Sequence, residues 1–426
     1  MSGGPSASGA VAPLLSRVPF SSKVKFLCLH LFCSLVVDLV LRVTRFFSRV
    51  WLGRDTTTAV YGSPQAKAFF SLERVDKVSY SDPPYSGHVS TILCALRPHR
   101  NIAYERMTHP GADGNPIYLD WLHTDARSAK GVFLIIPGLA SSSNTNYIEH
   151  FVWFASVNHF HCGVFNSRGM GNSPIETPRL MSAAWTDDLR TALLDGPFSR
   201  AAIEKRCGAG ISIIAVGFSL GGVILSKYVG EECLAGREVV VDAAMVVNAP
   251  LNCLHSHRVM SRSISKTLYQ PRMAGGLVAY ARRHSKVLKD LPGLSPDVRA
   301  AFTLGRLEEV MAHVKTVHDF DRLITAPTLG FATPEDYYHH VSPVEWLPHF
   351  SVPVLCIGAA DDPVTGELPM TNLASIMSCN PNVALLVMPY GGHLGYIRSV
   401  WDEWAGKETS MEKIIYEVAA AIVPRR

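Results

Sequence analysis

The sequence predicts an α/β fold: a doubly wound, mostly parallel sheet of eight strands, with a helical cap inserted before the seventh strand. Short apolar runs alternate with helical patterns over most of the chain, which is typical of a parallel sheet covered by helices on both faces. One apolar run leads directly into a Gly-x-Ser-x-Gly-Gly turn and a helical pattern. The cap is expected at about 249–350, because a connection this long far exceeds the roughly 2 to 6 residues that usually join a helix and a strand.

The eight strands are expected where branched and aromatic residues are bounded by turn residues. They cover 103–107, 117–121, 131–136, 163–166, 211–216, 239–248, 352–357 and 383–389. The first two flank Asp113 and Gly114, a pair that favours a tight turn, so they should form a hairpin. In a parallel sheet, ligands bind at the carboxyl ends of the strands, and the motifs described below all follow such ends.

Composition restricts the class of protein. The chain has 426 residues, 47% of them hydrophobic, which is enough for one large core. Its net charge of +4 is too small to indicate nucleic acid binding. The nine cysteines include no Cys-x-x-Cys pair, which favours reduced thiols and hence the cytosolic side of any membrane.

The chain before the sheet divides into three segments. Residues 1–22 are rich in Ser, Gly, Ala and Pro and predict a disordered tail, and residues 55–100 form an extension before the globular domain at 101–426. Residues 23–54 predict a membrane-associated helix, with the globular domain facing the cytosol. Its polar residues recur every three or four positions and form one stripe: His30, Ser34, Asp38, Arg42, Arg45 and Arg49.

How this helix would meet a membrane stays open. Its apolar part, 26–41, is shorter than the roughly 20 residues that a spanning helix needs, so it either spans with basic ends or lies in the interface. A soluble packing helix is the third alternative. The later segment from Asp242 to Asp290 has basic and apolar residues but no acidic residue between its ends, which favours attraction to anionic headgroups.

The Gly-x-Ser-x-Gly-Gly turn predicts a nucleophilic serine at Ser219. Gly217 and Gly221 lack the Cβ atoms that would clash where strand and helix approach, so Ser219 can stand exposed at the strand end. A serine hydroxyl needs a base, and His393 follows the last strand after a Gly-Gly pair. The strand before that one ends in Asp361 and Asp362, either of which could orient the base, although we favour Asp362.

An oxyanion also needs two amide donors. The amide of Leu220, directly after Ser219, is one candidate, and the amide of Leu139 in the Pro137-Gly138-Leu139 turn is the other. No cofactor or metal is expected, because the paired histidines at 159–161, 255–257 and 339–340 lack neighbouring ligands in a recognised pattern. The Gly-rich loop at 166–173 lacks the full dinucleotide fingerprint.

Several separated motifs resemble the YheT-type branch of the α/β-hydrolases, which includes membrane-anchored lipid esterases and phospholipases. The matching segments are 87–92, 112–121, 166–173, 217–222, 319–327, 330–338, 361–363 and 391–395. The resemblance implies an α/β-hydrolase fold, hydrolysis of carboxylic esters of lipids or other apolar acyl compounds, and a Ser219, Asp362 and His393 triad. The sequence departs from many α/β-hydrolases at Pro137, because those proteins have a histidine at this position. The chain has no His-x4-Asp motif, so acyl transfer is not expected. The alternative is a non-catalytic binding or scaffold protein that keeps the fold.

Overall fold

The computed structural model describes residues 58–75, 85–125, 129–366, 368, 370–398, 402 and 406–423, together with Val24, Lys25, Cys28, Leu29 and Phe32. The predicted tail at 1–22 and most of the predicted membrane helix at 23–54 therefore lie outside the described residues. None of the helices formed by the described residues combines the length and apolarity that crossing a bilayer requires.

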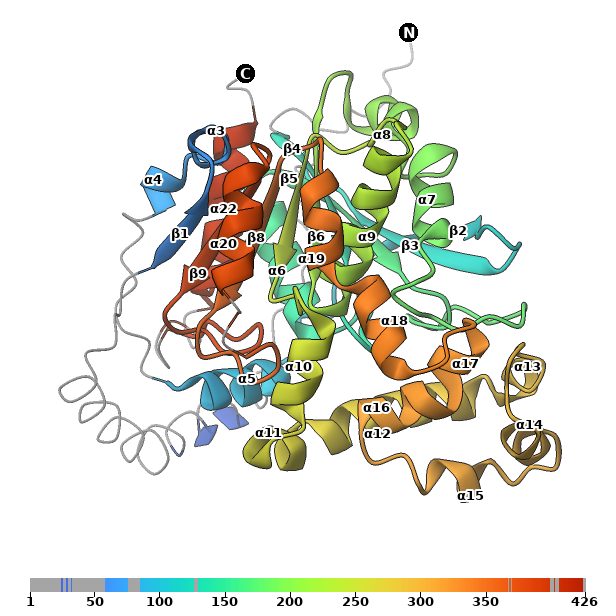
Figure 1. Cartoon of the computed structure of the whole chain (residues 1–426). Helices are drawn as coiled ribbons and strands as arrows, with labels where there is room; N and C mark the ends of the chain where they lie inside the picture. Colours follow the sequence, from blue (N-terminus) through green and yellow to red (C-terminus); the bar gives the residue numbers. More distant parts are fainter. Residues whose placement is uncertain are drawn as a thin grey trace, which may run out of the picture.

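One sheet of nine strands runs through the centre of the molecule (Figure 1). The strands are β1 (Ala59–Gly62), β2 (Glu105–Pro110), β3 (Pro116–Leu122), β4 (Gly131–Ile136), β5 (Phe160–Asn166), β6 (Ser212–Phe218), β7 (Ala243–Val247), β8 (Val354–Ala359) and β9 (Val383–Met388). Their order is β1-β9-β8-β7-β6-β4-β5-β3-β2, and the six strands from β9 to β5 are mutually parallel. The predicted α/β class with a mostly parallel sheet is confirmed.

The expected count of eight strands is wrong by one, because β1 was missed. This strand has four residues, none of them fully buried, and it pairs antiparallel with β9 at the edge of the sheet. A run this short has too few residues to show a strand period. The segment is a strand because it pairs with β9, from Ala59 opposite Val387 to Gly62 opposite Ala384.

The predicted hairpin is present at the other edge. Strands β2 and β3 pair antiparallel from Glu105 opposite Trp121 to Pro110 opposite Pro116, and the Gly111 amide donates to the Asn115 carbonyl at 2.7 Å. Strand β3 also pairs antiparallel with β5, which joins the hairpin to the parallel strands.

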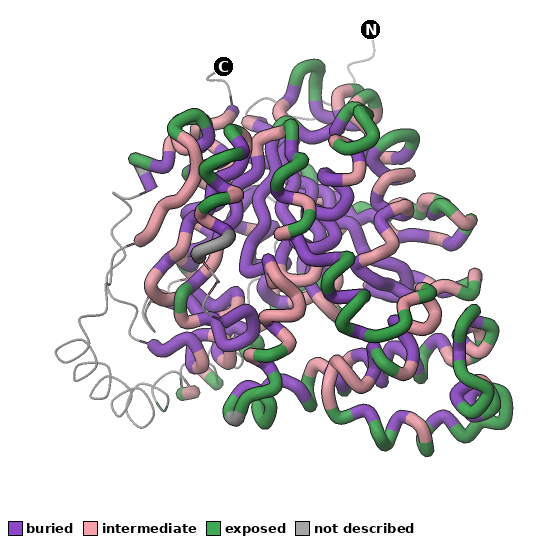
Figure 2. The backbone as a smooth tube through the Cα atoms, in the orientation of Figure 1, coloured by how far each residue is buried: buried purple, intermediate pink, exposed green. Residues whose placement is uncertain are grey.

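Helices cover both faces of the sheet, and Figure 2 shows its strands as the buried centre of the molecule. One face packs against α7 (Asp187–Leu194), α8 (Arg200–Cys207), α9 (Leu220–Leu234) and α20 (Met370–Cys379). The other packs against α3 (Pro64–Phe69), α4 (Leu72–Val75), α6 (Asn146–Val157) and α22 (Ser410–Ile422). The central strands β4 and β7 are buried at every position because both of their faces are covered.

The connection between β7 and β8 forms a group of helices below one edge of the sheet (Figure 1). These are α10 (Cys253–Met260), α11 (Ser263–Leu268), α12 (Gln270–Arg283), α13 (Ser285–Leu288), α14 (Pro296–Thr303), α15 (Leu307–Met311), α16 (Val317–Phe320), the π-helix η2 (Asp321–Thr325), α17 (Ala326–Thr328), α18 (Pro334–Val341), α19 (Pro343–Trp346) and the 3-10 helix η3 (Leu347–His349). Much of this group has a small core of its own, which includes Leu277, Leu288 and Phe320. We call these elements the cap. Helix α5 (Gly87–Leu96) lies beside them.

Candidate active site

Ser219 stands in the turn between β6 and α9. Its backbone has φ +52° and ψ −120°, a conformation that non-glycine residues rarely adopt and that costs on the order of 1 to 3 kcal/mol. The Ser219 amide donates to the Val247 carbonyl on the neighbouring strand at 2.9 Å, which helps to hold the turn. The strain puts the hydroxyl at the carboxyl end of the strand and at the N-terminus of a 15-residue helix.

The glycines around Ser219 are required by close backbone contacts. A Cβ on Gly221 would lie 2.0 Å from the Ile136 carbonyl oxygen, and one on Gly217 would lie 2.6 Å from the Gly221 oxygen. These distances are far below any real contact, so helix α9 can start this close to β4 and β6 only with glycine at both positions.

The structure brings Ser219, His393 and Asp362 together from three separate loops. His393 Nε2 lies 2.9 Å from Ser219 Oγ, and His393 Nδ1 lies 2.9 Å from Asp362 Oδ2. The side chain of His393 is 13% exposed, while that of Asp362 is completely buried. The imidazole therefore bridges a hydroxyl and a buried carboxylate, which is the geometry that base-assisted nucleophilic attack requires.

Asp362 is surrounded by donors. Its Oδ2 also accepts from Asn248 Nδ2 at 2.8 Å, and its Oδ1 accepts from the amides of Val364 and Thr365 at 2.8 and 3.1 Å. Burial by itself would raise the pKa of Asp362, but His393 and these donors outweigh it and hold the pKa below its usual value. The carboxylate therefore stays ionised beside the imidazole.

The neighbouring Asp361 has another task. Its Oδ1 accepts from the amides of Gly391 and Gly392, both at 2.9 Å, and so ties the end of β8 to the loop that carries His393. The two aspartates that sequence spacing left open thus differ in their partners: Asp362 contacts the imidazole and Asp361 contacts the backbone before it.

Two residues that sequence reasoning missed support the imidazole and its carboxylate. Thr91, on α5, accepts from the His393 amide at 2.8 Å and donates to the Gly87 carbonyl at 2.6 Å. Asn248, at the end of β7, has φ +46° and accepts from the Tyr396 hydroxyl while it donates to Asp362. Thr91 lies in the segment 87–92 that resembles the YheT-type branch, but no local pattern gives the role of either residue, because each lies more than a hundred positions from its partner in the site.

The two predicted oxyanion amides belong to residues that line the same cavity as Ser219. The turn that carries Leu139 touches Ser219, since a Cβ on Gly138 would lie 3.1 Å from the Ser219 Cβ. The Tyr147 hydroxyl accepts from the Gly138 amide at 2.9 Å and fixes this turn. Within the described residues, neither the Leu139 amide nor the Leu220 amide donates to a protein acceptor. Both donors are therefore available for a ligand.

A cavity of about 140 Å³ opens beside Ser219, between the sheet and the cap. Its wall is mainly apolar, with Leu220 and Leu139 near the serine and Leu277 and Met273 contributed by α12. Such a wall suits a hydrocarbon chain better than a polar substrate.

Curated relatives resemble most of the globular domain. The phospholipase ABHD3 of Mus musculus is 27% identical over 321 residues, which cover 73% of this chain and 70% of that protein. The monoacylglycerol lipase of Saccharomyces cerevisiae is 29% identical over 273 residues, which cover 63% of this chain and 56% of that protein. A solved esterase of Pyrococcus furiosus has a TM-score of 0.44 at 13% identity over 75% of this chain and 90% of that one. No protein-family model matches the sequence.

The chain has the α/β-hydrolase fold. It is an ester-hydrolysing enzyme, in keeping with the phospholipase and lipase among its relatives.

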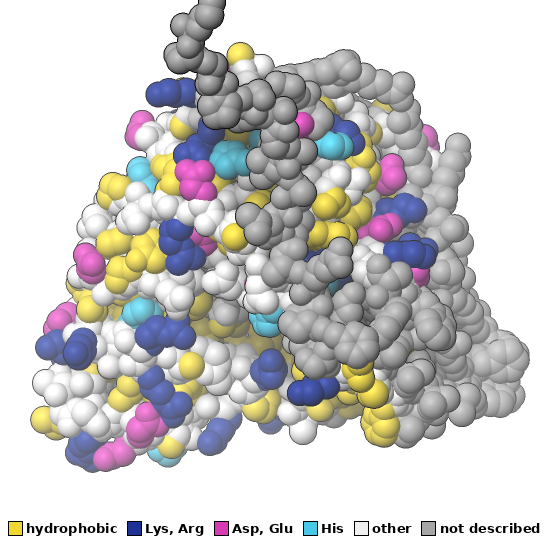
Figure 3. Space-filling model, turned by 180° about the vertical axis from the view of Figure 1, so that it is seen from behind, with side chains coloured by type: hydrophobic (Ala, Val, Ile, Leu, Met, Phe, Trp, Pro, Cys, Tyr) yellow, Lys and Arg dark blue, Asp and Glu magenta, His cyan; other side chains and the backbone are white. Residues whose placement is uncertain are grey.

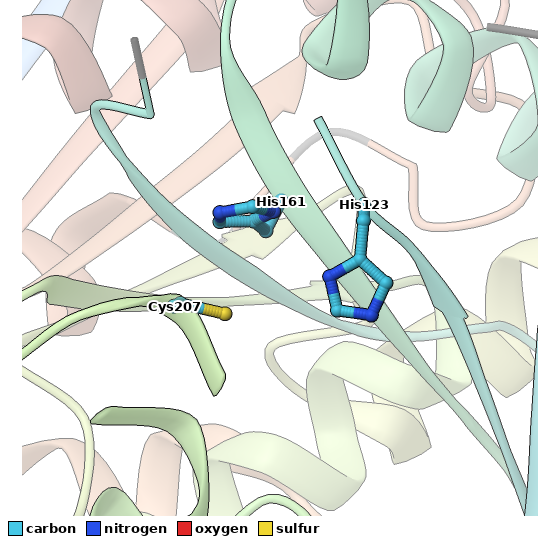
Figure 4. Close-up of side chains that lie close together, drawn as sticks. All are labelled: His123, His161 and Cys207. Carbon is cyan, nitrogen blue, oxygen red and sulfur yellow. The ribbon is translucent and has the colours of Figure 1, made fainter. Parts of the chain in front are cut away.

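Two groups of side chains in this hydrolase have the composition of metal ligands. The first group lies near the beginning of β5 and consists of His123, His161 and Cys207 (Figure 4). The Thr124 amide donates to His161 Nδ1 at 3.1 Å, so the proton of this neutral imidazole is on Nε2, where no lone pair remains for a metal. Arg206 Nη1 also lies 2.9 Å from His123 Nε2, and its positive charge opposes a bound cation. This group is a poor cation site.

The second group lies in the cap and consists of His257, His318 and Glu335. His318 Nε2 pairs with Glu335 Oε1 at 3.0 Å, and the rings of His257 and His318 stack with centroids 4.5 Å apart. Stacked rings direct their lone pairs into parallel planes, which does not favour a common metal. The sequence did not predict either group, because their members come from separate elements.

Proposed function

We propose that this hydrolase cleaves carboxylic esters of lipids through a covalent acyl-enzyme formed on Ser219. The main support is the unbroken hydrogen-bonded chain from Ser219 through His393 to Asp362, with 2.9 Å at each step. The unpaired amides of Leu139 and Leu220 beside the serine add the second element that acyl transfer to a serine needs.

The proposed reaction has two halves. In the first, Ser219 Oγ attacks the ester carbonyl carbon while His393 Nε2 takes its proton, and the amides of Leu139 and Leu220 hold the oxyanion. The intermediate collapses, the imidazolium protonates the leaving alcohol, and the acyl group stays on Ser219. In the second, water gives a proton to His393 Nε2 and attacks the acyl carbonyl carbon, and the bond to Ser219 Oγ breaks as the imidazolium returns the proton to that oxygen. The acid leaves and the serine hydroxyl is restored. Asp362 keeps Nδ1 protonated and stabilises the imidazolium throughout.

Membership of the YheT-type branch and a lipid substrate belong to the same proposal. The motifs that resemble this branch include the segments that carry Ser219, Asp362 and His393. The apolar cavity beside the serine favours an acyl chain, and the relatives named phospholipase and monoacylglycerol lipase favour a lipid ester.

We extend the proposal to a membrane surface as the place of action. In the cap, α11 exposes Ile264 and Leu268, which are 55% and 48% accessible, together with the charged ends of Arg262 and Lys266. Apolar and basic side chains on one short surface suit an anionic bilayer. Figure 3 shows further Lys and Arg side chains scattered over the lower part of the molecule, with hydrophobic ones between them. Arg282 takes no part in this surface, because it pairs with Glu308.

The predicted helix at 23–54 would be the second attachment. Of its few described residues, Phe32 is 56% exposed, and Leu29 packs against a cluster that includes Val89 and Leu93 of α5. In this proposal the catalytic domain faces the cytosol.

The catalytic proposal is tested with a fluorophosphonate probe and a panel of lipid esters of varied chain length and headgroup. Wild type should be labelled and should hydrolyse apolar esters, whereas Ser219→Ala should do neither. Equal labelling of both proteins would overturn the role of Ser219. Absence of any labelling and hydrolysis would favour the alternative of a non-catalytic binding protein.

Membrane attachment is tested on vesicles and in fractionated cells. Arg262→Gln combined with Lys266→Gln should weaken binding to phosphatidylserine-containing vesicles, with about 1 kcal/mol lost for each charge. Arg282→Gln is the matched control and should leave binding unchanged. Deletion of residues 1–54 should release active enzyme into the soluble fraction. A truncated protein that stays on membranes would leave the cap as the attachment, and one that is soluble but unfolded would make the helix part of the core.

A further inference from the structure

One acidic side chain lies in the mainly apolar wall of the cavity. Asp321 lines the same cavity as Ser219 and is only 6% exposed. Among the described residues it takes part in no ion pair, although burial of a carboxylate away from a cation is costly. A structural role alone would be served better by an uncharged residue.

The local structure holds Asp321 in place. It is the first residue of the π-helix η2, which follows α16 without a break, and π-helical turns occur frequently at functional sites. The Tyr338 hydroxyl, from α18, donates to Asp321 Oδ2 at 2.7 Å. Tyr338 and Thr325, which is in the same π-helix, also line the cavity. Two hydroxyls and a carboxyl group therefore share one part of the wall.

The remaining titratable neighbours do not neutralise Asp321. His318 is the one basic neighbour that acts on it, and this imidazole is hydrogen-bonded to Glu335. Tyr337 and Cys253 are uncharged at neutral pH, since burial raises the pKa of both well above that range. Among the described residues the carboxyl group therefore has hydroxyl donors but no cation paired with it.

We propose that Asp321, supported by Tyr338, forms a subsite that accepts a hydrogen bond from a hydroxyl group of the ester substrate. The inference rests on the proposed esterase function and specifies its substrate: an apolar ester with a free hydroxyl some distance from the ester bond. A carboxylate accepts such a hydrogen bond strongly and repels an anionic phosphate. The hydroxyl belongs either to the alcohol, as in a monoacylglycerol, or to a hydroxylated acyl chain.

The test compares three esters of one chain length: a monoacylglycerol, the plain alkyl ester, and an alkyl ester whose acyl chain carries a terminal hydroxyl. For wild type, kcat/KM should be higher for one of the two hydroxylated esters than for the plain ester. The ester that is preferred shows whether the hydroxyl belongs to the alcohol or to the acyl chain. Asp321→Asn should reduce that ratio about 10-fold, because a hydrogen bond to a charged group exceeds a neutral one by about 1.4 kcal/mol.

The matched control is Tyr280→Phe. Tyr280 lines the same cavity, but its hydroxyl is occupied by the Met181 amide and the Arg168 carbonyl, so the ratio should not change. Equal losses on all three esters in Asp321→Asn, or an unchanged ratio, would overturn the subsite. A wild type that hydrolyses no ester would instead contradict the proposed function.

A second measurement needs no variant. Burial raises the pKa of Asp321 to about 6, even though Thr325, Tyr338 and His318 favour its charged form. The ratio of kcat/KM for the hydroxylated ester to that for the plain ester should therefore rise as pH increases through about 6. A pH effect on the triad itself acts on both esters and cancels in the ratio. A ratio that is flat across this range would contradict the role of Asp321.

Discussion

Asp321→Asn should make the protein more stable at neutral pH. The pKa of Asp321 is raised from 3.8 to about 6 in the folded protein, mainly by burial. Between these two values the folded state keeps a proton that the unfolded chain has lost, so the free energy of unfolding falls as pH rises. Two pKa units correspond to about 3 kcal/mol, and this loss is complete above the folded pKa. An asparagine cannot ionise, so the variant does not lose this free energy of unfolding.

The assay is urea unfolding of wild type and Asp321→Asn at a series of pH values from about 4 to 7.5, compared at each pH. The variant should gain about 3 kcal/mol relative to wild type across this range. Asp319→Asn is the opposing control. Burial tends to raise the pKa of Asp319, but hydrogen bonds from Thr316 and from the Lys315 amide lower it below its usual value. The ionised Asp319 therefore stabilises the folded protein above the pKa of the unfolded chain, and this stabilisation disappears in acid. A difference for Asp321→Asn that does not depend on pH, or that grows in acid, would refute the reasoning.

Three further predictions concern the site. Asp362→Asn should lower kcat by about 10³- to 10⁴-fold, because the asparagine no longer fixes the imidazole tautomer, whereas Asp361→Asn should mainly lower stability; the reverse ranking in steady-state kinetics and unfolding would show that the wrong carboxylate was chosen. Gly221→Ala should lower the free energy of unfolding by more than about 2 kcal/mol, since its Cβ would lie 2.0 Å from a carbonyl oxygen, and a melting temperature like that of wild type would contradict this. Thr91→Val should leave the His393 amide without its acceptor and lower kcat more than it raises KM, while Thr91→Ser should restore activity; equal activity of the two variants would exclude a positioning role.

The parallel part of the sheet could be predicted because its information is local. Each central strand is a short apolar run bounded by turn residues, and burial on both faces makes such runs continuous. The edge strand β1 could not be predicted in the same way. Its four half-buried residues form a strand because β9 offers them partners, and that neighbour lies more than three hundred residues later in the sequence.

The same difference between local and long-range information applies to the functional residues. Ser219 could be found from its turn alone, because the close contacts of Gly217 and Gly221 leave a strict pattern in the sequence. The choice between Asp361 and Asp362 could not be made from spacing, since adjacent residues at a strand end point in different directions. Only the fold shows that one of them contacts His393 and the other contacts the backbone amides before it.

Backbone strain gives an indication of the site that does not depend on any motif. In the described part of the chain, nine residues other than glycine have positive φ, and five of them lie in or beside the proposed site: Ala140, Ser219, Asn248, Leu394 and Tyr396. Such conformations cost on the order of 1 to 3 kcal/mol each and persist only where the surroundings enforce them. The loops after β4, β6, β7 and β9 each carry at least one of the five, so the strain collects at the carboxyl ends of neighbouring strands. Together with the buried carboxyl group of Asp321 in the cavity beside Ser219, this places several destabilising features in one region, as expected if the substrate binds there.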